Sequence, residues 1–185
     1  MLHAIAALTI ACQAGPAFPS EPLDLKAVTG VRQQVYALND SRLNVFVFIS
    51  LDCPIANRYA PEIVRIAKDF AKREVTVFTI YVEQEISVDQ IAEHRKKFKR
   101  VCPALTDKGC GLVSQLGATV TPEAVVLDSH SRMLYRGRID DAWAAHGQPR
   151  TTNIRADLRI ALAEALDGRP VTVRQAPAIG CFIPR

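Results

Sequence analysis

Cys53 is the residue of this sequence best placed to act as a nucleophile. It follows the apolar run Leu43–Ser50, which is typical of a buried strand, and it directly precedes Pro54, where a helical pattern begins. A thiolate at the start of a helix faces free backbone N–H groups and the positive end of the helix dipole, which lower the pKa of the thiol and populate its nucleophilic form. A buried structural cysteine is an equally consistent interpretation, because free cysteine is among the most buried residue types.

The other cysteines are Cys12, Cys102, Cys110 and Cys181. Without Cys12, which lies in the N-terminal apolar segment, an even number remains, as suits an oxidising compartment. Cys102 and Cys110 are near enough in sequence for a small structural disulfide, or they are two semi-buried thiols. No pair has the spacing of a zinc site, and the four histidines do not cluster with the cysteines. The sequence therefore predicts no metal site and no bound cofactor.

The pair Thr121-Pro122 is the second feature with chemical meaning. It stands between a short helical pattern and an apolar strand. Proline cannot donate a hydrogen bond within a strand, and an X-Pro bond at the tight start of a strand is a candidate for the cis form. A trans proline at the start of the strand is the simpler alternative.

The surrounding apolar patterns predict alternating strands and helices in one α/β domain, with a mixed central sheet, helices on both faces and an antiparallel edge. The polar stretch 139–153 predicts a solvated loop. The predicted strands are Leu43–Ser50, Val75–Val82 and a hairpin of residues 120–128 and 132–138. The first predicted helix starts at Pro54 and is kinked at Pro61, and the second opens with a Ser87–Gln90 capping box. A short helix is predicted before Gly117, and a last helix has its apolar face on residues from Ile154 to Leu166 and ends at Gly168.

These fixed points resemble the thioredoxin-like fold, and within it the redoxin group that includes alkyl hydroperoxide reductase and thiol-specific antioxidant relatives. The resemblance covers about residues 25–168 and is carried by the strand VFVFIS, Cys53, Pro61 and Thr121-Pro122. In thioredoxin-like proteins the threonine-proline pair is the cis-proline beside the reactive cysteine. The resemblance implies that Pro122 shapes the site and presents backbone to a substrate. The stretches CPIAN, SQLGATVTPE and YRGRIDD are also similar to exported bacterial redoxin-domain proteins with a late Gly-Cys, here Gly180-Cys181.

The sequence departs from this family where a partner thiol is expected. Ala56 stands where a thioredoxin-type dithiol has its second cysteine, and Phe46 stands where peroxiredoxins have proline, although Ser50 fits their hydroxyl position. Cys53 must therefore form a mixed disulfide, become a sulfenic acid, or be resolved by a distant thiol. Cys181, in a flexible extended tail, is the best distant thiol, and a free thiol or an intermolecular tether is its alternative role.

Length and charge set outer limits on the function. The chain has 185 residues, of which 49% are hydrophobic and 23% charged, as expected for one globular domain with extensions. The net charge is only +4, and the basic run Arg95–Arg100 follows a helical pattern. That run predicts a solvated helix end rather than a surface for nucleic acid.

The N-terminus predicts export. Residues 1–20 combine a short apolar run with small residues suited to cleavage, and the run is too short to span a membrane. We therefore expect a signal peptide over 1–20, a thioredoxin-like redoxin domain over 21–168 and an extended C-terminal tail over 169–185. The predicted location is extracytoplasmic, either periplasmic or secreted, with lipid attachment at Cys12 as a lesser alternative.

The sequence thus predicts an exported thiol-based oxidoreductase. Its site residues are Cys53 as nucleophile, Thr121 and Pro122 beside it, and Cys181 as resolving thiol, and its partners are a protein disulfide or small peroxide and an external thiol reductant. Two alternatives stay open. The absent thiol at Ala56 favours a non-catalytic thioredoxin-like binding module, and Cys53 with Cys181 would also suit a copper or haem-maturation factor.

Overall fold

The computed structural model describes residues 23, 27–31 and 33–184. The predicted signal peptide and Cys12 lie outside these residues and stay predictions. The centre of the fold is β3 (Leu43–Ile49), in which every residue is buried, next to β4 (Val75–Tyr81). Both strands are apolar at nearly every position because both of their faces are covered.

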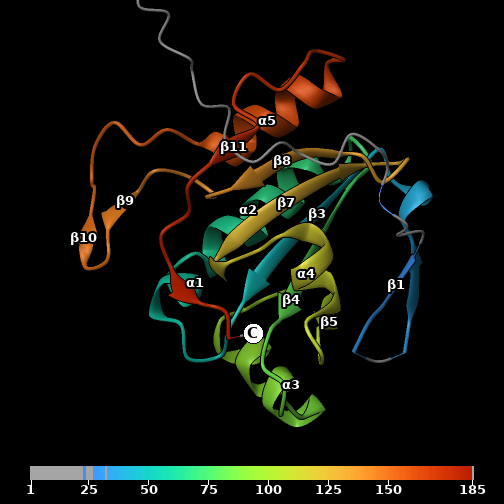
Figure 1. Cartoon of the computed structure of the whole chain (residues 1–185), viewed down its shortest axis with the longest axis vertical. Helices are drawn as coiled ribbons and strands as arrows, with labels where there is room; N and C mark the ends of the chain where they lie inside the picture. The colour runs from blue at the N-terminus through green and yellow to red at the C-terminus, as the bar shows by residue number, and fades with distance from the viewer. Residues whose placement is uncertain (1–22, 24–26, 32, 185) are drawn as a thin grey trace, which may run out of the picture.

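A six-stranded mixed sheet runs in the order β11-β8-β7-β3-β4-β5 (Figure 1). Strands β3, β4 and β5 are parallel, β7 is antiparallel to β3 and β8, and β11 is parallel to β8. The predicted hairpin of β7 and β8 is confirmed. The bounds of the remaining strands of this sheet are β5 (Ala104–Thr106), β7 (Glu123–Asp128), β8 (Met133–Gly137) and β11 (Gln175–Ala176).

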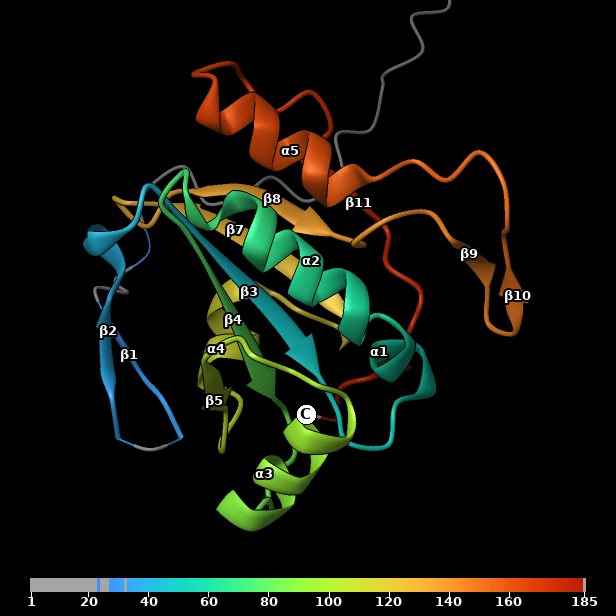
Figure 2. The same ribbon diagram turned by 180° about the vertical axis from the view of Figure 1, so that it is seen from behind.

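Helices cover both faces of the sheet, as predicted (Figures 1 and 2). Helices α2 (Ala60–Ala71) and α5 (Asp157–Leu166) lie on one face, and α4 (Gly111–Leu116) lies on the other. Successive side chains of a strand point to opposite faces. In β3 this places Val45 and Val47 in the cluster with α2 and α5, and Phe46 and Phe48 in the cluster with α4.

The helix that begins at Pro54 is broken where a kink was predicted. It consists of α1 (Pro54–Arg58) and α2, joined at Tyr59, and Pro61 lies in the first turn of α2. Proline is tolerated there because its missing N–H would have no partner within the helix. Helix α3 (Val88–Lys97) begins with the predicted capping box, and α4 ends at Gly117, whose φ of 69° is left-handed.

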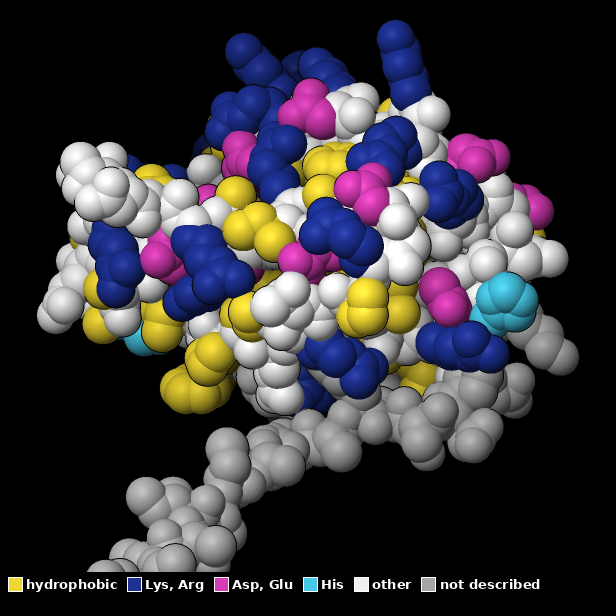
Figure 3. Space-filling view, turned by 90° about the horizontal axis from the view of Figure 1, so that it is seen from above, with side chains coloured by type: hydrophobic (Ala, Val, Ile, Leu, Met, Phe, Trp, Pro, Cys, Tyr) yellow, Lys and Arg dark blue, Asp and Glu magenta, His cyan; other side chains and the backbone are white. Residues whose placement is uncertain are grey.

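Ion pairs join α5 to its neighbours. Arg159 contacts Glu62 at 2.7 Å and Asp69 at 2.8 Å, both on α2, and Arg73 contacts Asp167 at 2.7 Å. Figure 3, which looks onto the molecule from above the view of Figure 1, shows lysine and arginine side chains interleaved with acidic ones. The start of α5 corrects the sequence prediction, because the helix begins at Asp157 and Ile154 is exposed.

Two small hairpins extend from the sheet. Strands β1 (Ala27–Thr29) and β2 (Val35–Ala37) form one, followed by a short 3-10 helix, Leu38–Asp40. Strands β9 (Trp143–Ala145) and β10 (Gln148–Pro149) form the other, within the stretch predicted as a solvated loop. The β9–β10 hairpin projects past α1 (Figure 1). The guanidinium of Arg58, on α1, lies over the ring of Trp143, on β9, 5.5 Å from its centroid.

The C-terminal segment is extended, as predicted, but it is not a free tail. Strand β11 pairs with β8, and strand β12 (Cys181–Phe182) pairs antiparallel with β6 (Val120–Thr121). Ala176 and Ile183 are buried beside these strands. No helix in the described part of the chain is long and apolar enough to cross a membrane.

Candidate functional site

Cys53 caps the N-terminus of α1. The chain leaves β3 at Ile49, turns, and reaches Cys53 in an extended conformation, so the Cys53 sulfur accepts a hydrogen bond from the N–H of Ala56 at 3.4 Å. Pro54 follows in the first helical turn, where its missing N–H would have had no partner within the helix. The Cys53 side chain is only 1% exposed. The sulfur is therefore held at a helix start and covered by protein.

The Thr121-Pro122 peptide bond is cis and lies against Cys53. The Cys53 thiol donates a hydrogen bond to the carbonyl oxygen of Thr121 at 3.0 Å. The buried carboxylate of Glu123 holds this turn from behind, because it accepts the N–H of Thr119 at 2.7 Å and that of Val120 at 3.4 Å. The side chain of Glu123, the residue that follows Pro122, thus fixes the backbone turn beside the thiol.

Cys181 is the second thiol of the site. The register of β12 on β6 places Cys181 opposite Thr121, and the side chains of Cys181 and Cys53 lie close enough to shift each other's pKa. Both are free thiols, and Cys181 is half-buried where Cys53 is buried. The structure therefore brings together all of the site residues predicted from the sequence: Cys53, Thr121, Pro122 and Cys181.

The surroundings of the two sulfurs separate their pKa values. Burial alone raises the pKa of Cys53, but the neighbouring Cys181 and the hydrogen bond from the Ala56 N–H favour the thiolate, so the pKa is lowered overall. Burial and the neighbouring Cys53 sulfur raise the pKa of Cys181 to about 11. Cys53 is therefore the thiol that ionises first, with Cys181 as the proton-bearing neighbour.

A buried polar network fastens α1 from below. Asn57, on α1, donates to the carbonyl of Leu51 at 2.7 Å, and its side-chain oxygen accepts from Nε2 of His94 at 2.8 Å. The other His94 nitrogen, Nδ1, accepts the hydroxyl of Tyr81 at 2.9 Å. This arrangement satisfies a neutral imidazole with its proton on Nε2. The network joins α3, β4 and the helix that carries Cys53.

Arg100 is a site residue that the sequence did not reveal. The basic run Arg95–Arg100 predicted a solvated helix end, but Arg100 is only 4% exposed, and its guanidinium donates to the carbonyl of Ala56 at 2.9 Å. The chain turns at Lys99, whose φ of 52° is left-handed, and this turn directs the next side chain inward. Six neighbouring positions that are nearly all basic carry no signal of which one is buried.

Cys102 and Cys110 take no part in the site. Both are free thiols, so the small disulfide considered from the sequence is not formed in this structure. Cys102 is buried, which raises its pKa. Cys110 is half-buried, and its sulfur accepts a hydrogen bond from Gln84 at 3.1 Å. Within the described residues, no group of three or more His, Cys, Asp or Glu side chains is placed to hold a metal ion.

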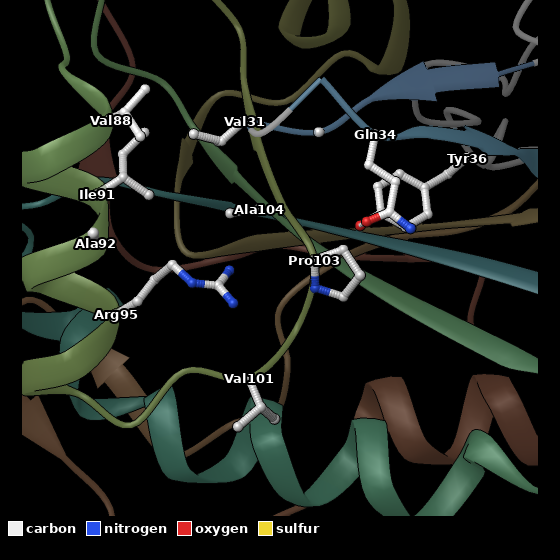
Figure 4. A pocket seen from close by; sticks show the side chains of 11 residues that line it. Val31, Gln34, Tyr36, Val88, Ile91, Ala92, Arg95, Val101, Pro103 and Ala104 are labelled. Carbon is white, nitrogen blue, oxygen red and sulfur yellow. Dashed lines mark hydrogen bonds between the residues drawn. The ribbon is translucent and has the colours of Figure 1, made fainter.

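A pocket of about 300 Å³ lies between α3, β5 and the β1–β2 hairpin (Figure 4). Most of the side chains that line it are apolar, and Arg95 is its cationic side chain. That guanidinium is bonded to the carbonyl of Cys102 at 2.5 Å. No cysteine lines this pocket, so it contains no thiol nucleophile.

Comparison with known proteins assigns the chain to a family. The model of the AhpC/TSA family matches residues 16–136, well over half of the chain. The chain belongs to the AhpC/TSA family. Membership of this redoxin family supports a thiol-based redox function. The matched residues include Cys53 and Thr121-Pro122, whereas Cys181 lies beyond them. No curated protein matches the sequence.

Solved structures resemble the AhpC/TSA chain at two levels. A hypothetical protein from Sinorhizobium meliloti is 25% identical with a TM-score of 0.76, and the match covers 92% of this chain and 95% of that one. An uncharacterized conserved protein from Geobacillus kaustophilus is 28% identical with a TM-score of 0.75, covering 94% of each chain. A thioredoxin-like protein from Aeropyrum pernix is 18% identical with a TM-score of 0.53, covering 60% of this chain and 79% of that chain, and shows the shared fold alone.

Proposed function

We propose that this protein is a thiol oxidoreductase in which Cys53 is the nucleophile and Cys181 is the resolving thiol. The observation that carries the proposal is the pairing of β12 with β6, which places Cys181 opposite Thr121, the residue whose carbonyl oxygen accepts a hydrogen bond from Cys53. The pKa of Cys53 is lowered at its helix start, and that of Cys181 is raised beside it. A partner thiol at position 56 is absent, and the C-terminal strand supplies one instead. Predicted export, which rests on residues 1–20, is part of the same proposal.

The first step is attack by the Cys53 thiolate. With a hydroperoxide, the sulfur takes the terminal oxygen, the O–O bond breaks, and Cys53 becomes a sulfenic acid while an alcohol or water leaves. With a disulfide, a mixed disulfide forms and the other sulfur leaves as a thiolate. The N–H of Ala56 favours the reacting anion, and the cis-proline turn fixes the backbone beside it.

The second step is attack by Cys181. Its sulfur displaces hydroxide from the sulfenic acid, or the substrate thiol from the mixed disulfide, and its proton neutralises the leaving group. The product in both cases is a Cys53–Cys181 disulfide. An external thiol reductant then reduces this disulfide and returns both thiols, which closes the cycle.

The test is to count thiols after a stoichiometric addition of hydrogen peroxide to the reduced protein. We expect the wild type to lose two thiols per peroxide, with Cys102 and Cys110 still free in peptide maps. Cys181→Ser is expected to lose one thiol and to give a Cys53 sulfenic acid that dimedone traps. Cys53→Ser is expected to react no faster than free cysteine.

The proposal would be contradicted if the wild type and Cys53→Ser reacted at the same slow rate, both with cystine and with hydrogen peroxide. The domain would then be a binding module that keeps the fold without the chemistry, as Ala56 suggests. A matched control is Cys110→Ser, which removes a half-buried thiol outside the site and is expected to leave the result unchanged.

A further inference from the structure

The C-terminal segment 174–184, which we call the strap, lies across the site and is attached at two points. At the first, β11 pairs with β8, and the N–H of Arg138 donates to the carbonyl of Ala176 at 3.0 Å. At the second, β12 pairs with β6, and the N–H of Ile183 donates to the carbonyl of Thr119 at 3.0 Å. The strap is therefore a fixed part of the fold on both sides of Cys181.

Glycine is required at both attachments. A Cβ at position 180 would lie 2.1 Å from the carbonyl oxygen of Thr121 and 3.1 Å from the nitrogen of Pro122. A Cβ at Gly137, whose φ is 152°, would lie 2.0 Å from the carbonyl oxygen of Ala176. These neighbours are backbone atoms that cannot move aside cheaply. Gly180 thus allows the strap to approach the cis-proline turn directly before Cys181.

The strap occupies the backbone edge that a polypeptide would need. Extended peptides commonly bind by adding a strand to an exposed edge, where main-chain hydrogen bonds supply affinity. The edge nearest to Cys53 is β6, and within the described part of the chain its strand partner is β12. A small oxidant needs only the sulfur to become accessible, whereas a polypeptide disulfide needs the strand edge as well.

We propose that the strap makes the site selective for low-molecular-weight oxidants over polypeptide disulfides, and that Gly180 is the residue that determines this selectivity. The inference rests on the proposed function of Cys53. It narrows the substrate from any disulfide or peroxide to oxidants that place no backbone on β6. The Cys181 strand occupies that edge and at the same time carries the resolving thiol.

The test compares two probes with the same reacting bond. One is N-acetylcysteine amide and the other an extended peptide, each carrying thionitrobenzoate as a mixed disulfide on its cysteine. Cys53 attacks the cysteine sulfur, the S–S bond breaks, and thionitrobenzoate leaves with the electron pair, so no further oxidant is needed. Mass spectrometry of the Cys53 peptide confirms that the adduct forms there.

We expect the wild type to react with the small probe about tenfold faster than with the peptide, because the peptide must displace β12 from β6, and breaking two backbone hydrogen bonds costs about that factor. Gly180→Ala should displace β12 and bring the ratio of the two rates close to one. The ratio is the readout because any change in the reactivity of Cys53 itself affects both probes equally. Gly111→Ala is the matched control, since the nearest atom to a Cβ there is 3.7 Å away.

A second variant, Ile183→Ala, weakens the seating of the strap through a buried side chain and should shift the ratio in the same direction. A wild-type ratio near one would overturn the inference, as would a ratio that neither variant changes. A peptide rate that falls in Phe182→Ala would also overturn it, because polypeptides would then dock on this 84% exposed side chain. If neither probe reacts with the wild type or with any variant faster than it reacts with free cysteine, the proposed function itself fails.

Discussion

The reactivity of Cys53 is decided by a competition between burial and hydrogen bonding. Burial opposes the thiolate, and it is the largest single influence on the pKa of this group. Cys181 and the N–H of Ala56 act in the other direction, and the Cys181 side chain has a larger effect than the Ala56 N–H. Cys181 therefore has two roles at one position, because it stabilises the thiolate before it resolves the oxidised product.

Replacing Cys181 by alanine should raise the pKa of Cys53, because the neighbour that lowers this pKa most is lost while most of the burial remains. Cys181→Ser keeps a hydroxyl donor and should retain part of the lowering. The measurement is the pH dependence of Cys53 alkylation by iodoacetamide, read by mass spectrometry. The midpoint is compared rather than the rate, since a smaller side chain at 181 also changes access. An unchanged midpoint in Cys181→Ala would show that the two sulfurs are not coupled.

At the scale of elements, α3 is the support of the helix that carries Cys53. His94 bonds Asn57 on α1 and Tyr81 on β4, and Arg100 holds the carbonyl of Ala56. Burial, followed by the charges of Arg100 and Lys97, lowers the pKa of His94 to about 4. The imidazole is therefore neutral at physiological pH, as its two hydrogen bonds require.

This network predicts an acid-sensitive contribution to folding. Because the pKa of His94 is lower in the folded chain than in the unfolded chain, the unfolded state binds the extra proton first as pH falls. The contribution of His94 is complete above about pH 6.5 and should shrink by about 2 kcal/mol on going down to about pH 5. Urea unfolding at several pH values checks this in the wild type and in His94→Gln.

The variant separates this residue from the other titrating groups. Glutamine can still donate to Asn57 but does not titrate, so the difference in unfolding free energy between wild type and His94→Gln should change with pH over that range. A constant difference from neutral pH to pH 5 would mean that His94 titrates normally in the folded chain. His130→Gln, an exposed position, serves as the matched control.

At the scale of the whole molecule, the fold brings together Cys53 and Cys181, which are far apart in the sequence. The strap runs from β11, beside β8, to β12, beside β6 (Figure 1). This path brings Cys181 next to Cys53. Neither the sheet nor the helices alone contain both sulfurs. The candidate site is therefore complete only when the C-terminal segment is seated, which makes the strap part of the site rather than an appendage.

Much of the sheet was predictable from the sequence because its signals are local. The uninterrupted apolar run of β3, the Ser87–Gln90 capping box and the proline before β7 each follow from a few neighbouring residues, and the positions of Cys53 and Thr121-Pro122 followed from them. Cys181 was inferred to be a site residue because Ala56 stands where a partner thiol is expected. Its actual placement needed the structure.

The remaining features depend on contacts between distant segments. The strap carries no apolar periodicity, so its two-residue strands could not be distinguished from a free tail. Arg100 is buried by a turn at Lys99 that the basic run does not announce. Ile154 fits the helical pattern of α5 but precedes the helix, because Asp141 accepts the N–H of Arg155 and draws the chain into the preceding loop.

The most direct test of a Cys53–Cys181 redox pair is peptide mapping under non-reducing conditions after one equivalent of hydrogen peroxide. The structure predicts that the peptide containing Cys53 is recovered linked to the peptide containing Cys181, in a monomer, with Cys102 and Cys110 as free thiols. Recovery of Cys53 as a sulfinic acid beside an unmodified Cys181, or in a disulfide with any other cysteine, would contradict it.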